Sequence, residues 1–265
     1  MADIGSDDAW APLVNRFVGG HYGTLRGRVR THVIDRHLAA HLPPPPLRIV
    51  DVGGGAGHQS IPLARRGYDV TIVDPSPAML DMAREALAAE GESVAGRVHI
   101  VHACGEDAPD ALGQHPYGAV LCHGVVMYLE DPRPLVDALC ALVTPGGIVS
   151  IVAKNVEVLA CRPALAGNWA EALAAFDADR QVNGLGMETR GDSVAGLSDM
   201  LVARGVEPVA WYGVRLFTDG WARERLPDEP EDLVLAVEVE ASRRDPYRQL
   251  SRLFHLVGVR RPPEH

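Results

Sequence analysis

Residues 47–57 read Leu47-Arg-Ile-Val-Asp-Val-Gly-Gly-Gly-Ala-Gly57, a short apolar run that ends in an acid and continues into a glycine-rich segment. The apolar run predicts a buried strand, and the glycines predict a tight turn whose backbone can approach a ligand closely. Residues 59–66 have helical character, and a second apolar run that starts at Val70 ends at Asp74. This order of strand, glycine turn, helix, strand and carboxylate is typical of a nucleotide-binding βαβ unit.

The parts of this unit suit different parts of a ligand. The helix after the turn offers free N–H groups and positive partial charge to a ligand carboxylate. Asp74 is expected at the carboxyl end of the second strand, where it can accept hydrogen bonds from both hydroxyls of a ribose. A tight turn with no ligand is the structural alternative.

The glycine spacing decides between two nucleotide cofactors. The dinucleotide pattern needs glycine three places after its second glycine, and counted from Gly55 that place is His58, which fits NAD poorly. Three alternate glycines preceded by an acid, here Asp51, instead resemble the loop of the class I methyltransferases, which bind S-adenosylmethionine (SAM).

Three further segments support this interpretation. Residues 75–84 begin a helix directly after Asp74, and residues 104–108 follow the strand expected at Val98–His102. In methyltransferases that second position holds the adenine. Residues 142–150 contain a Pro-Gly-Gly turn that resembles the entry to the fifth strand of these enzymes.

The pattern beyond these motifs predicts an α/β fold. Strands and helices alternate, which indicates a mostly parallel sheet with helices on both faces, seven-stranded and Rossmann-like as in class I methyltransferases. Strands are expected at 48–52, 70–73, 98–102, 119–122, 148–152, 207–217 and 253–260, and helices at 60–66, 78–90, 134–143 and 231–243.

The domain organisation follows from breaks in this rhythm. Residues 1–42 read as a helical N-terminal lid, and the prolines at 43–46 form a stiff connector into the core. Residues 43–265 form the SAM-binding core, in which a lid-like insertion follows the fifth strand at about 155–200.

Composition narrows the function further. The chain has 265 residues and a net charge of −10, which disfavours electrostatic capture of DNA but permits a local basic patch. No apolar stretch suits a membrane, and the acidic start is unlike a signal peptide, so we expect a cytoplasmic protein. The four cysteines stand alone, so neither a metal site nor a disulfide framework is expected.

Methyl transfer needs alignment and exclusion of water more than it needs an acid or a base. His123 follows the fourth strand at the edge of the expected pocket, and a positioning or packing role is favoured there over a general base. Tyr128, Asp131, Trp169 and Tyr212 either line the pocket or pack.

The chain resembles the CmoM family of tRNA 5-carboxymethoxyuridine methyltransferases almost from end to end. The glycine loop and the Pro-Gly-Gly turn occur in many methyltransferases, and the resemblance also includes Cys122-His-Gly124, Asp131-Pro-Arg133 and Gly167-Asn168. Three patterns are more particular to this family: Tyr22-Gly-Thr24 with Arg30, Gly213-Val-Arg215 with Phe217, and Asp245-Pro-Tyr247.

The resemblance implies SAM as cofactor and a tRNA carboxylate as acceptor, which is already anionic and needs no base. Arg215 or Arg244 would then hold the acceptor, and Gly105 and Glu106 would lie near the adenine. With the contacts that the motifs predict, the expected SAM-binding residues are Tyr22, Arg30, Asp51, Gly53, Gly54, Gly55, Gly57, Asp74, Pro75, Met79, Gly105, Glu106 and His123.

The acceptor has an alternative. Where the family has a lysine-rich insertion, residues 171–188 contain Arg180 as the single basic residue, and this departure favours a small metabolite over tRNA. An NAD-dependent oxidoreductase and a non-catalytic SAM-binding protein are the more distant alternatives.

Overall fold

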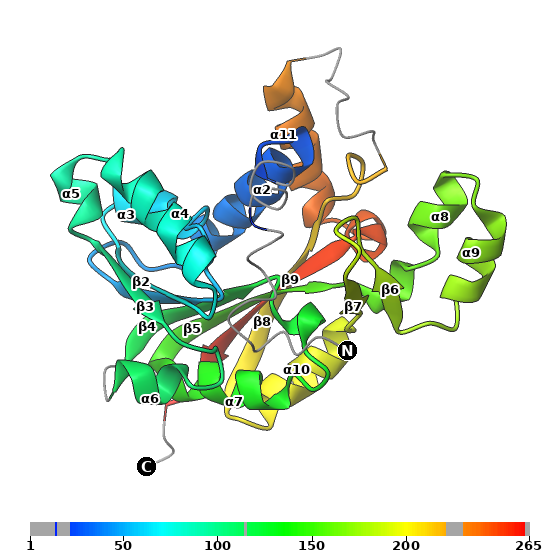
Figure 1. The fold of residues 1–265 in the computed structure, drawn as a ribbon. Coiled ribbons are helices and arrows are strands. Elements are labelled where there is room, and N and C mark those ends of the chain that lie inside the picture. Colours follow the sequence, from blue (N-terminus) through cyan, green and yellow to red (C-terminus); the bar gives the residue numbers. More distant parts are fainter. Residues whose placement is uncertain (1–13, 15–21, 114–115, 221–229, 263–265) are drawn as a thin grey trace.

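One seven-stranded sheet organises the molecule (Figure 1). The computed structural model describes residues 14, 22–113, 116–220 and 230–262. The strand order is β3-β2-β1-β4-β5-β9-β8, and β9 runs opposite to the other six strands, which confirms the predicted α/β class. The strands are β1 (Arg48–Val52), β2 (Asp69–Asp74), β3 (Val98–His102), β4 (Tyr117–His123), β5 (Val143–Lys154), β8 (Val206–Val214) and β9 (Leu253–Arg260).

Helices cover both faces of this sheet, as the alternating pattern predicts (Figure 1). The side chains of β1 alternate between the two layers, with Ile49 in one and Val50 and Val52 in the other. One layer contains α2 (Leu25–His41), α3 (Ser60–Arg65), α4 (Pro77–Ala88), α5 (Glu92–Ala95) and α11 (Glu231–Ser242); the other contains α6 (Ala108–Leu112), α7 (Arg133–Leu142) and α10 (Val194–Val202).

Helix α2 belongs to the core of the protein. Its N-cap Thr24 accepts a hydrogen bond from Gly27 N at 3.3 Å, and Val29 and Val33 are fully buried in the first layer. The helix falls within the predicted N-terminal lid, of which residues 1–13 and 15–21 lie outside the described residues. The lid role of residues 1–42 stays a prediction.

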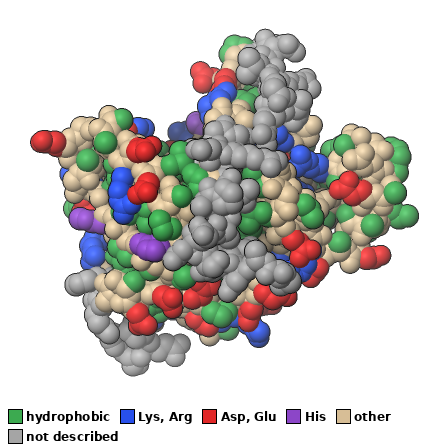
Figure 2. Space-filling model, viewed as in Figure 1, with side chains coloured by type: hydrophobic (Ala, Val, Ile, Leu, Met, Phe, Trp, Pro, Cys, Tyr) green, Lys and Arg blue, Asp and Glu red, His purple; other side chains and the backbone are tan. Residues whose placement is uncertain are grey.

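The insertion after β5 has two parts. Helices α8 (Cys161–Leu165) and α9 (Trp169–Ala175) project from the body of the protein, whereas β6 (Arg180–Val182) and β7 (Glu188–Arg190) form a two-stranded sheet (Figure 1). Figure 2 shows exposed hydrophobic side chains on this projection, where Trp169 is 72% exposed. The next helix, α10, packs Leu197 and Leu201 against the main sheet.

Element ends differ from the expected ones for local reasons. Strand β5 begins at Val143 rather than at 148, because Val143 pairs with Tyr117 of β4 before the Pro-Gly-Gly turn. Strand β8 ends at Val214, three residues early, because Arg215 adopts a left-handed φ of 63°. No helix in the described parts of the chain has both the length and the apolar character needed to cross a bilayer.

Candidate functional site

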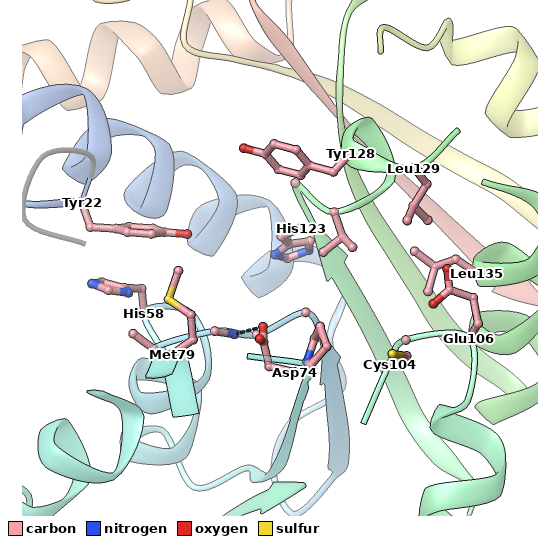
Figure 3. Close-up of a pocket in the computed structure, with 18 residues that line it drawn as sticks. Tyr22, His58, Asp74, Met79, Cys104, Glu106, His123, Tyr128, Leu129 and Leu135 are labelled. Carbon is pink, nitrogen blue, oxygen red and sulfur yellow. Dashed lines mark hydrogen bonds between the residues drawn. The ribbon is translucent and has the colours of Figure 1, made fainter. Parts of the chain in front are cut away.

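The glycine turn after β1 is tied to the end of β2. Gly53 has a φ of 72° and its N–H donates to the Val73 carbonyl at 2.7 Å. A Cβ at Gly53 would lie 2.2 Å from Val125 Cγ2, so only glycine fits there. Gly55 N–H donates to Asp74 Oδ2 at 2.9 Å, and this bond is drawn in Figure 3. The turn and the carboxylate therefore form one rigid unit.

Asp74 is held by backbone donors. Its Oδ1 accepts from Ser76 N at 2.9 Å, while Oδ2 accepts from Gly55. Burial raises the pKa of Asp74 to about 6, and these two backbone bonds oppose the rise. Each carboxylate oxygen keeps a lone pair, so the side chain can still accept two ribose hydroxyls.

Asp51 lies beneath the turn. Ser60 donates its hydroxyl to Asp51 Oδ2 at 2.6 Å, and the carboxylate is only 2% exposed. Burial raises the pKa of Asp51 to about 6. The side chain does not line the cavity above the turn, so it supports the turn from below.

A cavity that opens to solvent lies over this turn; we call it the loop pocket (Figure 3). Ten predicted residues line it: Tyr22, Gly53, Gly54, Gly55, Asp74, Pro75, Met79, Gly105, Glu106 and His123. Arg30, Asp51 and Gly57 do not. The lining also contains residues that the sequence prediction missed: Ala56, His58, Cys104, Gly124, Val125, Leu129 and Leu135.

Two aromatic groups close one end of the loop pocket. Figure 3 shows Tyr22 stacked on His58. The ring centroids are 3.7 Å apart and the interplanar angle is 10°. Tyr128 lies across the pocket from them, and burial raises its pKa to about 12, so the phenol stays neutral. The sequence indicates that Tyr128 either lines the pocket or packs. For His58, only its position directly after the glycine turn indicates a place in the pocket.

Arg30 and His123 meet at the carboxyl end of β4. Arg30 Nη2 donates to the His123 carbonyl at 2.9 Å, and Arg30 is only 5% exposed. His123 Nε2 lies 2.8 Å from Ser150 Oγ. Burial and, to a lesser extent, the charge of Arg30 lower the pKa of His123 to about 3. The imidazole is therefore neutral and a weak base, which agrees with the positioning role favoured from the sequence.

A second cavity adjoins the first; we call it the basic pocket. It shares Tyr22, His123, Gly124 and Tyr128 with the loop pocket. Neither Asp nor Glu occurs among the described residues that line it. A protein of net charge −10 thus has a strongly positive cavity beside the loop pocket. Its six cationic side chains are Arg26, Arg30, Lys154, Arg162, Arg215 and Arg252.

Several donors in the basic pocket are not used by the protein. Arg215 forms a buried ion pair with Asp219, but its Nε has no partner within the described residues. Arg252 Nη2 donates to Gln181 Oε1 at 2.8 Å, whereas Arg252 Nη1 has no hydrogen-bond partner within the described residues. Lys154 Nζ donates to Thr189 Oγ1 at 2.8 Å. Such a set of donors suits an anionic ligand.

The other sequence candidates lie elsewhere. Arg244 has a side chain that is 64% exposed, pairs with Glu240 and lines neither pocket. Asp131 accepts from Arg133 N at 3.0 Å at the start of α7, and Tyr212 stacks on His37. No group of three or more His, Cys, Asp or Glu side chains in the described ranges is placed to hold a metal ion.

Known proteins resemble this chain in sequence and in fold. The family described as "Methyltransferase domain" matches residues 50–149. The tRNA 5-carboxymethoxyuridine methyltransferase of Escherichia coli (strain K12) is 29% identical over 266 residues, which cover 99% of this chain and 98% of that protein.

Two solved structures illustrate the likeness in fold. The Haloferax volcanii complex of the Trm112 methyltransferase activator with a methyltransferase matches with a TM-score of 0.64 at 16% identity, covering 98% of this chain and 99% of that one. Magnesium protoporphyrin IX methyltransferase of Synechocystis PCC 6803 with bound SAH matches with a TM-score of 0.59 at 16% identity, covering 89% and 85%. At this identity the structures support the fold alone.

Proposed function

We propose that the chain is a SAM-dependent class I methyltransferase that methylates a carboxylate oxygen, with 5-carboxymethoxyuridine in tRNA as the acceptor. The observation that carries this proposal is the basic pocket. Its cationic side chains, with unused donors on Arg215 and Arg252, adjoin the loop pocket where the cofactor fits. An anionic acceptor is the chemistry that such a pocket recognises.

The loop pocket fits SAM in three respects. Gly53 keeps the turn free of a side chain, so the backbone can contact the ligand. Asp74 has free lone pairs for the ribose hydroxyls. Leu129 and Leu135 give the cavity an apolar wall beside Glu106, where a flat adenine ring would pack.

The residues present favour a carboxylate over a hydroxyl acceptor. A bound SAM would supply a methyl group on a positively charged sulfur, and the carbon–sulfur electron pair would stay on sulfur when the methyl group is transferred. A carboxylate acceptor is already anionic and would have no proton to lose, so no base would be required. A hydroxyl acceptor would need one, and His123 with a pKa of about 3 is a poor base at neutral pH.

Lys154, Arg215 and Arg252 are placed to hold the acceptor. Guanidinium groups bind a carboxylate through two parallel N–H donors, and burial strengthens this interaction. Arg30 holds the His123 carbonyl, where the two pockets meet, and so supports their common wall. Arg162 and Arg26 complete the positive lining.

The acceptor could be a tRNA or a small carboxylic acid, and different observations favour each. The relative from Escherichia coli, similar along the whole chain, favours tRNA, whereas the net charge of −10 favours a small carboxylic acid. Methyl-labelled SAM should be incubated with the protein and either tRNA from a strain lacking this activity or a small-metabolite extract. We expect label in tRNA. Label only in small molecules would overturn the tRNA acceptor while leaving carboxylate chemistry intact.

Cofactor affinity is expected to fall at acidic pH. The pKa of Asp74 is raised to about 6, so the group is ionised at pH 7 and becomes protonated as the pH drops through 6. A protonated carboxyl accepts hydrogen bonds from ribose hydroxyls more weakly. Calorimetric titration with S-adenosylhomocysteine (SAH) should give constant affinity between pH 7 and 8 and weaker binding at pH 5. Asp74→Asn should bind weakly with a flatter profile; a wild-type affinity that does not change with pH would contradict this assignment.

Lys154→Met is expected to stabilise the ligand-free protein while impairing catalysis. Burial, with Arg252 and Arg162 nearby, lowers the pKa of Lys154 from 10.5 to about 7. Lys154 therefore binds its proton more weakly in the folded protein than in the unfolded chain. This difference destabilises the fold at any pH at which the lysine is charged in the unfolded chain. Methionine removes this cost, and Thr189 keeps its bond to the Gln181 carbonyl at 2.8 Å.

We expect Tm to rise by about 2–4 °C at pH 7 in thermal unfolding followed by circular dichroism. The KM for the acceptor should rise about tenfold, because a charged donor is lost. A lower Tm together with an unchanged KM would show that Lys154 has only a structural role.

A further inference from the structure

A chain of buried hydrogen bonds links His123, at the boundary of the two pockets, to the contact between α2 and α11. His123 Nε2 lies 2.8 Å from Ser150 Oγ, which lies 2.7 Å from His255 Nε2. His255 Nδ1 lies 3.2 Å from His37 Nδ1, and His37 Nε2 lies 2.8 Å from Ser242 Oγ. We call these five residues the imidazole chain.

The fold brings these residues together from distant parts of the sequence. His123 is on β4, Ser150 on β5 and His255 on β9, three neighbouring strands of the sheet. His37 comes from α2 and Ser242 from α11, two of the helices that cover this face. All five are buried, and His123 is the most exposed at 9%.

The direction of the hydrogen bonds follows from the far end of the imidazole chain. Ser242 Oγ lies 2.7 Å from the Val239 carbonyl, which only accepts, so the hydroxyl proton of Ser242 points there. Ser242 Oγ must then accept a hydrogen bond from His37 Nε2–H. Burial lowers the pKa of His37 to about 3, so the ring carries one proton and its Nδ1 is an acceptor.

The same reasoning runs back to the pocket. His255 Nδ1 donates to His37 Nδ1, since two bare nitrogens at this distance would repel each other. Burial also lowers the pKa of His255, so its Nε2 has no proton and accepts from the Ser150 hydroxyl. That hydroxyl has a single proton, so Ser150 Oγ accepts from His123 Nε2.

We propose that the imidazole chain is a positioning device that fixes His123 as its Nε2–H tautomer and leaves Nδ1 as an acceptor for a donor of the bound ligand. His123 Nδ1 is buried and has no hydrogen-bond partner in the described part of the chain. A buried acceptor without a partner is costly. Because His123 lines both pockets, a ligand N–H or O–H can satisfy this nitrogen.

The imidazole chain orients His123 rather than carrying protons. Its last member, Ser242, donates to the Val239 carbonyl, which cannot pass a proton onward. At the near end, a protonated His123 would place a second cation beside Arg30, whose Nη2 holds the His123 carbonyl at 2.9 Å. Both ends therefore favour one fixed arrangement with neutral rings.

Nitrogen-15 NMR of histidine-labelled protein tests the proposal directly, because protonated and bare ring nitrogens have different chemical shifts. In the ligand-free protein we expect the proton on Nε2 of His123 and His37, and on Nδ1 of His255. This part does not depend on the proposed cofactor or acceptor. A proton on Nδ1 of His123, or on Nε2 of His255, would overturn the proposal.

Ser242→Ala tests whether the far end controls the pocket. The variant removes the group that fixes the direction, so His123 should show a mixture of tautomers, and SAH affinity should fall about fivefold through the lost acceptor. Ser242→Thr should restore the wild-type shifts. Thr71→Val, which removes a buried hydroxyl from β2 outside the imidazole chain, should leave the His123 shifts unchanged.

The ligand part of the inference rests on the proposed SAM site and has its own readout. On SAH addition, the Nδ1 shift of His123 should move toward that of a hydrogen-bonded nitrogen. Tight SAH binding with an unchanged Nδ1 shift would overturn the ligand contact. A His123 shift pattern that Ser242→Ala leaves unchanged would show that the outer residues have only a structural role.

Discussion

Asp74→Ala is expected to weaken SAH binding about 1,000-fold. The change removes the acceptor for two ribose hydroxyls, and each hydrogen bond to a charged group contributes about 1.5–3 kcal/mol. It also releases the N–H of Gly55, which holds the glycine turn in place. Isothermal titration calorimetry of the two proteins with SAH measures the loss.

A matched variant on the same strand controls for general damage. Asp69 lies at the opposite end of β2, where it pairs with Arg97 at 3.1 Å and has a side chain that is 44% exposed. Asp69→Ala should bind SAH as the wild type does. Equal SAH affinity for Asp74→Ala and the wild type would mean that the ribose lies elsewhere.

Arg252→Met is expected to raise the KM for the acceptor about 100-fold without changing SAH affinity. The guanidinium lines the basic pocket, its Nη1 has no partner in the described chain, and it lies outside the lining of the loop pocket. Loss of a buried charged donor costs about 2–3 kcal/mol of binding to an anion. Initial rates over a range of acceptor concentrations, with SAH titration alongside, measure both effects.

Arg244→Met provides the contrasting variant. Arg244 was a candidate from the sequence for holding the acceptor, but its side chain is exposed and lines neither pocket. We expect wild-type kinetics from it. If Arg244→Met raised the KM for the acceptor and Arg252→Met did not, the acceptor would bind near the C-terminal end of α11 and not in the basic pocket. Arg215 is a less suitable test, because its removal would leave the buried Asp219 without its ion-pair partner.

The sequence predicts the loop pocket well because its signals are local. The turn and Asp74 follow adjacent strands, and parallel strands present their carboxyl ends at one edge of the sheet. Strand β3 has the predicted bounds, Val98–His102, because its apolar run is short and ends in polar residues. Asp51 lies outside the lining of the loop pocket and accepts a hydrogen bond from Ser60, so its contact with a ligand stays a prediction.

The basic pocket and the imidazole chain have no local signal. Lys154 and Arg162 come from β5 and α8, and Arg252 directly precedes β9, so only the folded chain brings them together. His123 and His255 read in sequence as isolated polar residues in apolar segments, and His37 follows two charged residues of a helix. Tertiary packing decides these sites, and the β6–β7 pair was missed because its strands have three residues each.

The alkaline lability of the transferred methyl group tests the central claim most directly. tRNA from a strain lacking the activity would be labelled with methyl-labelled SAM and this protein, digested to nucleosides, and divided into untreated and mildly alkaline portions. Mild alkali hydrolyses a methyl ester and releases its methyl group as methanol. We therefore predict that the untreated portion contains labelled 5-carboxymethoxyuridine methyl ester and that the alkaline portion contains the label as methanol. Label that stays on the nucleoside after alkali, as an ether or an N-methyl group would, contradicts methylation of a carboxylate.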